Sequence, residues 1–112
     1  MLKKLKKLEV LNLVLNSKQF LNMPFGIHGR AHACRVFVLA NTLSNLVKNK
    51  KEIDILTVTI SSLLHDCGRS NNGKDTYHGI NSAKKAIEFV DENNILCDKN
   101  LIKDCIIRHC SP

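Results

Sequence analysis

The sequence predicts an all-α fold, a compact bundle of about five helices. Apolar residues recur at spacings of three and four over several segments, as they do on one face of a helix. No two strand-like segments are joined by a hairpin turn, and there is no internal repeat. The length of 112 residues is typical of one domain, so we expect a single core over residues 1–112.

The N-terminal segment, residues 1–20, is predicted to contain a basic amphipathic helix. Over residues 2–15, lysines alternate with leucines spaced by three and four: Leu2, Leu5, Leu8, Leu11 and Leu15. Such a helix can dock on the core or on a membrane. We favour a first helix with its lysines in solvent, because one short basic helix is weak evidence for a membrane.

Two more helices are predicted before residue 68. The first of them, about 18 residues long, follows a loop at Asn22 to Gly29 and carries an apolar stripe: Val36, Phe37, Ala40, Leu43 and Val47. The next, from Glu52 to about Cys67, is apolar almost all round, which indicates a buried central helix. Its β-branched run at 57–60 would also suit a strand, but a length near 15 residues favours a helix.

The C-terminal part is predicted to form two helices after a polar loop at 68–76. The fourth helix carries Ile80, Ala83, Ile87 and Val90, and the fifth carries Leu101, Ile102, Cys105 and Ile106. Each set recurs at helical spacing.

Charge and composition narrow the class of partner. The net charge is +7, but Lys3, Lys4, Lys6 and Lys7 crowd into the first eight residues, and the rest is mildly basic. We therefore expect a body that attracts anionic substrates. Aromatic residues make up 4% of the chain, which argues against a nucleic-acid-binding platform. No uncharged run approaches the roughly 18 residues of a membrane helix.

The cysteines indicate a reducing compartment. There are five, an odd number, and no C-x-x-C pair, which argues against a disulfide framework and a zinc ribbon. Reduced thiols are typical of the cytoplasm, so we expect a cytoplasmic protein. The oligomeric state is left open, and a homo-oligomer is compatible with the sequence.

Histidines are the candidate chemical groups. His28, His32 and Arg35 are spaced i, i+4, i+7 and would share a helix face. A pair of histidines at this spacing is a surface or capping pair more often than a metal site. His78 and His109 are each compatible with a core histidine. Four helices that each present such a residue also match the way bundles build metal sites.

His65 and Asp66 end the most apolar helix. An ionised carboxylate is costly to bury there unless a cation or several donors compensate it. One hypothesis is that Asp66 caps the following loop. The other is metal coordination, because imidazole and carboxylate are good ligands for divalent ions.

Three ordered motifs carry a resemblance to a known family. They are I-H-G-R-A-H-A-C-R-V at 27–36, L-L-H-D-C-G-R at 63–69 and D-T-Y-H-G at 75–79. Together they resemble the HD-domain superfamily of metal-dependent phosphohydrolases, in particular small members with an I-H-G-x-x-H-x-x-R-V opening. The resemblance covers about residues 24–112, the expected HD core.

The resemblance implies a role for each motif residue. It implies one or two divalent ions (Mn, Fe, Mg, Co, Ni or Zn) held by His32, His65, Asp66, His78 and His109. Asp66 and Arg69 would be catalytic. Arg69 suits a phosphate oxygen, and His28 and Arg35 are assigned with it to substrate binding.

The chain departs from the family at its C-terminal side. Members of the superfamily usually complete the first site with an aspartate on a helix beyond the equivalent of His109, and nothing after Asp104 is acidic here. We therefore expect a C-terminally short HD domain. The chain is shortened, or another subunit supplies the ligand, or the site is incomplete.

The function implied is hydrolysis of a phosphate ester, in a nucleotide or another small phosphorylated metabolite. The alternative is a degenerate or truncated HD domain that binds metal or ligand without efficient turnover. A third hypothesis, a nucleic-acid adaptor acting through the N-terminal lysines, is weakened by the few aromatic residues and the localised charge.

Overall fold

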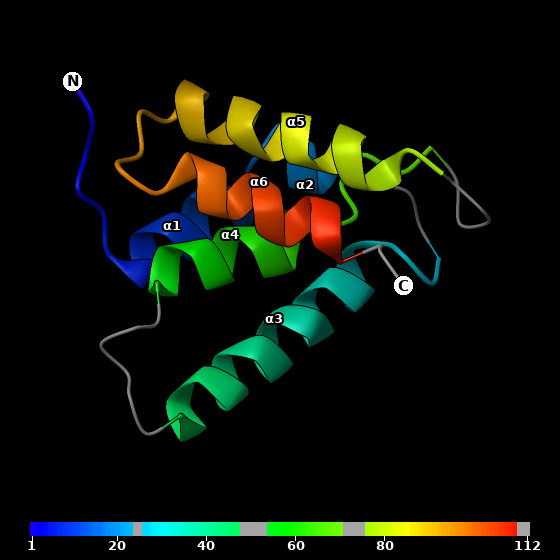
Figure 1. Ribbon diagram of the computed structural model, residues 1–112, viewed down its shortest axis with the longest axis horizontal. Coiled ribbons are helices and arrows are strands. Elements are labelled where there is room, and N and C mark those ends of the chain that lie inside the picture. The colour runs from blue at the N-terminus through cyan, green and yellow to red at the C-terminus, as the bar shows by residue number, and fades with distance from the viewer. Residues whose placement is uncertain (24–25, 48–53, 71–75, 110–112) are drawn as a thin grey trace.

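The computed structural model describes residues 1–23, 26–47, 54–70 and 76–109 and confirms the predicted all-α fold (Figure 1). Six helices lie within these ranges: α1 Lys7–Leu15, α2 Lys18–Leu21, α3 Arg30–Leu46, α4 Ile55–Leu64, α5 His78–Glu92 and α6 Lys99–Arg108. Over the same residues there is no strand, only an isolated parallel bridge between Lys3 and Ile95. The ends predicted at Glu52 and at Lys48 to Lys50, and most of the loop at 68–76, lie outside the described residues.

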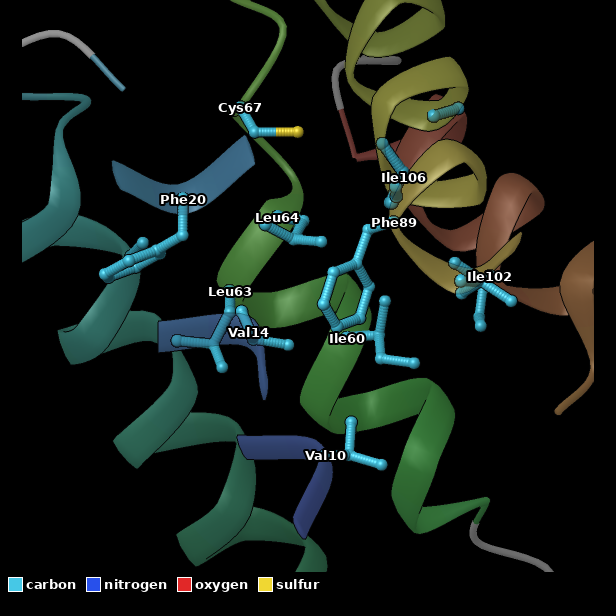
Figure 2. Close-up of a cluster of buried hydrophobic side chains, with 14 of the residues drawn as sticks. Val10, Val14, Phe20, Ile60, Leu63, Leu64, Cys67, Phe89, Ile102 and Ile106 are labelled. Atoms are coloured by element: carbon cyan, nitrogen blue, oxygen red, sulfur yellow. The ribbon is translucent and has the colours of Figure 1, made fainter. Parts of the chain in front are cut away.

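Helix α4 is the centre of the bundle, as predicted. It packs against each of the other five helices, and Ile60, Leu63 and Leu64 are completely buried. The helix begins where the Asp54 carboxylate accepts a hydrogen bond from the Thr57 amide (3.1 Å), as an N-cap residue does. The side chains that surround α4 in the core include Val10, Val14, Phe20, Phe89, Ile102 and Ile106 (Figure 2).

The predicted N-terminal helix is wrong for residues 2–6. There the main chain pairs with the segment after α5: the Lys3 amide donates to the Asn94 carbonyl (2.6 Å), and the Leu96 amide donates to the Lys3 carbonyl (2.8 Å). In a helix these groups would bond along their own segment. Helix α1 begins only at Lys7, and it docks on the core through Val10 and Val14.

Helix α2 was not predicted. The Ser17 hydroxyl accepts a hydrogen bond from the Phe20 amide (3.2 Å) and starts this short helix directly after α1. The turn buries Gln19 and Phe20, so the end of the predicted N-terminal segment belongs to the core.

Helix α3 lies where it was predicted, but its apolar stripe packs differently. Ala33 is its only buried residue, and Leu43 and Val47 are 54% and 45% exposed. The main packing partner of α3 is α4, and Figure 1 shows α3 along one side of the bundle. The predicted stripe is therefore wrong for its C-terminal half, because α3 has one principal neighbour.

Helices α5 and α6 pack against each other (Figure 1). Asp98 caps α6 by accepting a hydrogen bond from the Leu101 amide (3.0 Å). Of the apolar residues predicted on the fifth helix, Ile102 and Ile106 are buried, whereas Leu101 and Cys105 are exposed. His78 is the first residue of α5 and His109 directly follows α6, so both lie at one end of the pair.

Two smaller expectations concern membranes and thiols. Among the described residues, no helix combines the length and the apolar character that crossing a membrane requires. The four cysteines within those ranges, Cys34, Cys67, Cys97 and Cys105, are free thiols.

The central position of α4 predicts a large effect of truncating its core side chains. Ile60→Ala should lower the free energy of unfolding by about 2–5 kcal/mol, because Ile60 has no solvent exposure. The matched control is Ile55→Ala on the same helix, where the side chain is 41% exposed and the loss should be about 0.5 kcal/mol. Urea unfolding followed by circular dichroism measures both. Equal losses would contradict the central role of α4.

Candidate metal centre

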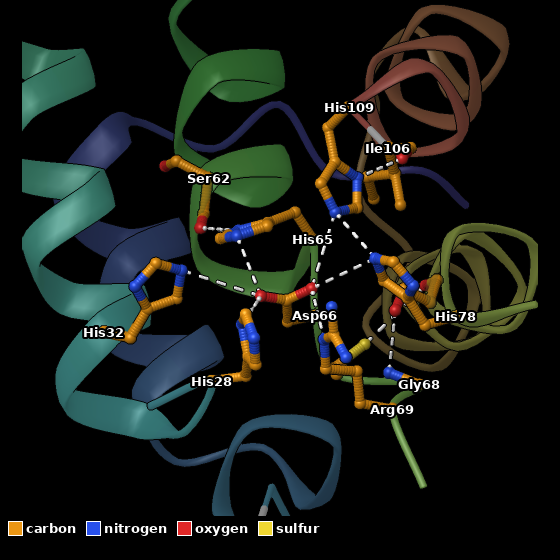
Figure 3. Close-up of polar contacts among 12 residues, drawn as sticks. His28, His32, Ser62, His65, Asp66, Gly68, Arg69, His78, Ile106 and His109 are labelled. Carbon is orange, nitrogen blue, oxygen red and sulfur yellow. Dashed lines mark hydrogen bonds and ion pairs between the residues drawn. The ribbon is translucent and has the colours of Figure 1, made fainter. Parts of the chain in front are cut away.

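Asp66 lies at the centre of the candidate site, two residues beyond α4, and only 2% of it is exposed. Six side chains place a nitrogen within 3.6 Å of its carboxylate oxygens (Figure 3): His28, His32, His65, Arg69, His78 and His109. A buried carboxylate remains ionised only where cations or donors compensate it. The cluster supplies that compensation.

The six groups divide between the two oxygens. Three imidazoles face Oδ2, through His65 Nε2 at 3.2 Å, His28 Nδ1 at 3.3 Å and His32 Nε2 at 3.6 Å. Figure 3 shows them on one side of the carboxylate, with the remaining three groups on the other. One carboxylate therefore contacts two sets of nitrogens, and a ligand atom of His65 in the first set lies within 4.8 Å of one of His109 in the second.

The second set faces Oδ1. Arg69 Nε lies 3.2 Å from this oxygen, His109 Nε2 lies 3.4 Å from it and His78 Nε2 lies 3.5 Å from it. The two imidazole nitrogens lie 3.2 Å from each other. The structure thus brings together all five residues that were predicted as metal ligands, although they span residues 32–109.

Helix ends build this cluster. His32 lies in the first turn of α3, His65 directly follows α4, His78 begins α5 and His109 directly follows α6. A helix end has a free first or last turn of backbone, so side chains there can converge without distorting a helix interior. The site lies where four helix ends meet.

Backbone carbonyls set the orientation of two imidazoles. Nδ1 of His65 lies 2.7 Å from the Ser62 carbonyl, and Nδ1 of His109 contacts the Ile106 carbonyl. A carbonyl only accepts, so each Nδ1 carries a hydrogen, and in neutral imidazole Nε2 then has a lone pair. Those lone pairs face the Asp66 oxygens, and such an arrangement is repulsive unless a proton or a metal ion lies between them.

Proton affinities in the cluster reflect the same pairing. Burial alone would raise the pKa of Asp66, but hydrogen bonds from His109 and His65 outweigh it and hold that pKa far below its usual range. The hydrogen bond to Asp66 raises the pKa of His109. Burial and the charge of His65 lower the pKa of His32, so His32 presents a lone pair at neutral pH.

The residues present fit a divalent metal ion. With bonds of about 2.1 Å to nitrogen, the ligand atoms of a four-coordinate ion lie about 3.4 Å apart, and the nitrogens lie 3.2–3.6 Å from the carboxylate oxygens. Ligand atoms lie within 4.8 Å of one another in two groups, His28–His32–Asp66 and His65–Asp66–His109. An Nδ1–H bonded to a carbonyl is also typical of metal-binding histidine. The cluster can hold a metal ion.

Gly68 and Ser82, which the sequence analysis did not single out, fasten the loop after Asp66 to α5. The Gly68 amide donates to the Ser82 hydroxyl (2.8 Å), and the Cys67 thiol donates to the Ser82 carbonyl (3.6 Å). A Cβ on Gly68 would collide with the backbone of Asn81 and Ser82. The glycine in H-D-C-G was the signal in the sequence that could have indicated this role. The close contact itself depends on α5, which is distant in sequence, so the sequence alone does not show it.

Arg35 and Arg69, both predicted to bind substrate, are placed differently. Arg69 joins the cluster, and its side chain is 10% exposed. Arg35 is exposed on α3, and within the described residues it makes no ion pair with Asp66. It contributes only a charge that lowers the pKa of His32.

Compared with known proteins, the chain matches no protein-family model, no curated protein and no solved structure.

The contact between Gly68 and α5 predicts a coupled loss of stability and metal affinity. Gly68→Ala should lower the free energy of unfolding by about 1–3 kcal/mol, the usual effect of overpacking. It should also weaken metal binding, because α5 carries His78. Thermal unfolding with and without metal measures both effects. An unchanged melting temperature and metal affinity would contradict the close contact.

The Asp66–His109 pair predicts a pH dependence in protein stripped of metal. The pKa of His109 is raised above 6.5, so the pair stabilises the fold fully below about pH 6.5, and the effect is lost as the pH rises through the raised value. The pKa of Asp66 is lowered, so this carboxylate stays ionised throughout. Asp66→Asn should therefore cost about 1.5–3 kcal/mol more at pH 5.5 than at pH 9. Urea unfolding in a chelator tests this, and equal costs at both pH values would contradict it.

Proposed function

We propose that this chain is a metal-dependent phosphohydrolase of the HD-domain type, acting on a phosphate ester in a nucleotide or another small phosphorylated metabolite. The observation that carries the proposal is the position of Asp66. One buried carboxylate lies between five imidazoles and a guanidinium, all within 3.6 Å. The three motifs that resemble the superfamily supply all of these residues except His109.

The metal ligands are assigned from the contacts to Asp66. His32 and His65 lie with Oδ2, and His78 and His109 lie with Oδ1. A bound divalent ion polarises a phosphoryl oxygen and lowers the pKa of a water molecule. The low pKa of Asp66 keeps its carboxylate available as a ligand and as a hydrogen-bond acceptor that orients a water.

The charge balance supports an anionic substrate. Among the described residues, Asp66 is the only acid in the cluster, and it is opposed by Arg69 and the histidines. A divalent ion would make the site more positive still, and a positive cleft concentrates anions. A phosphate ester matches this charge.

Arg69 supports a phosphate in particular. Its Nε lies 3.2 Å from Asp66 Oδ1, which holds the guanidinium beside the candidate ligands. A guanidinium presents several N–H groups in one plane and matches two phosphate oxygens at once. We assign Arg69 the role of binding the phosphate and neutralising charge that develops on it.

The proposal predicts metal-dependent release of phosphate. Protein reloaded with Mn, Fe, Mg, Co, Ni or Zn should hydrolyse at least one member of a panel of nucleotides and phosphorylated metabolites. Asp66→Asn should lower kcat/KM by about 100-fold or more, because it removes the carboxylate shared by both sets of ligands. Arg69→Gln should lower kcat/KM about 10- to 100-fold and leave metal content unchanged.

Arg108→Gln is the matched control, since Arg108 is exposed on α6 and pairs with Asp104. It should keep full activity. Bound metal without turnover on any substrate would contradict the enzyme proposal and favour the alternative, a domain that binds metal or ligand only. Absence of bound metal would contradict the enzyme proposal and the metal-binding form of the alternative.

A further inference from the structure

We infer that His28 is a ligand of the metal ion held at Asp66 Oδ2, and not a contact to substrate. The inference rests on the proposed metal-dependent function, and it changes the role that the sequence motif implied for His28. With His32 and Asp66, His28 forms a group of three ligand atoms that lie within 4.8 Å of one another.

The position of His28 is the first argument. Its Nδ1 lies 3.3 Å from Oδ2, between the values for His65 (3.2 Å) and His32 (3.6 Å). Its side chain is 26% exposed, against 31% for His32. His28 is therefore as close to Oδ2 as the predicted ligands His32 and His65, and its side chain is about as buried as that of His32.

The number of nitrogens at Oδ2 is the second argument. A carboxylate oxygen has two lone pairs and accepts two hydrogen bonds well, yet three imidazoles face this oxygen. Hydrogen bonding to Oδ2 therefore does not account for all three rings. A cation bound by Oδ2 and the nitrogens of His28 and His32, which lie within 4.8 Å of one another, accounts for two of these rings.

A turn before α3 directs His28 to this position. The Gly29 amide donates to the Gly26 carbonyl (3.1 Å) and closes the turn. Gly26 has φ 119°, a conformation that favours glycine. His28 is thus held two residues before α3, and Figure 3 shows its ring beside Asp66 with His32 of α3 on the same side.

The donor set also indicates the class of metal. Imidazole nitrogens suit Fe, Co, Ni and Zn, whereas Mg²⁺ prefers oxygen ligands. Two imidazoles and a single carboxylate oxygen therefore favour a transition metal over Mg²⁺ at Oδ2. Co²⁺ is the probe of choice, because its visible absorption reports the ligands.

The first experiment titrates protein stripped of metal with Co²⁺ and compares wild type, His28→Asn and Arg35→Gln. The asparagine amide can still donate a hydrogen bond to Asp66, but it is a poor metal ligand. We expect Co²⁺ affinity to fall at least about tenfold in His28→Asn and not to fall in Arg35→Gln, which changes the other motif residue assigned to substrate and removes a positive charge near His32. A wild-type affinity in His28→Asn would overturn the inference, as would an equal loss in both variants.

The second experiment uses His28→Cys, which replaces one metal ligand by another. A thiolate bound to Co²⁺ gives a charge-transfer band in the near ultraviolet, and we expect this band in His28→Cys but not in wild type. Wild type keeps Cys67 and the other native cysteines, so it controls for any band that they give. Bound Co²⁺ without the band would overturn the inference but leave the proposed function standing. Failure of wild type to bind any metal would overturn both.

Discussion

The buried carboxylate of Asp66 is the constraint on which the arrangement of this domain depends. It follows the most apolar helix of the bundle, where an uncompensated charge would cost about 3–5 kcal/mol. Compensation comes from the ends of α3, α5 and α6 as well as from its neighbours His65 and Arg69. The charge of Asp66 can therefore be buried only because four helix ends meet around it.

Core and site are connected through α4. Its buried residues, Ile60, Leu63 and Leu64, anchor it among all the other helices, and the chain leaves it directly into His65 and Asp66. Gly68 then binds to Ser82 of α5, which fixes the distance between the carboxylate and the helix that begins with His78. A change in core packing at α4 would thus reach the site over a few residues of backbone.

Local patterns predicted most of the helices and the position of His65 and Asp66 at the end of the most apolar helix. Helical periodicity and a charge at the end of an apolar helix are properties of contiguous residues, so the sequence shows them directly. Long-range contacts were beyond that reasoning. Residues 2–6 are extended because Lys3 pairs with Asn94 and Leu96, and no pattern within the first 20 residues shows it. His28 is a ligand candidate because a turn at Gly26 with φ 119° directs it back to Asp66, and the role of Gly68 requires α5 to be in place.

The helices that supply histidines to the two oxygens of Asp66 are packed into the bundle to different extents. The Oδ1 side draws His78 and His109 from α5 and α6, which pack closely on each other. The Oδ2 side draws His28 and His32 from α3 and the turn before it, and α3 has α4 as its main partner and one buried residue. A ligand that binds only the folded state stabilises it, so the binding of a metal ion adds to the free energy of unfolding. An ion at Oδ2 would join α3 to the end of α4, where apolar packing contributes least. The polar site would then hold α3 against the bundle, as apolar packing in the core holds α5 and α6.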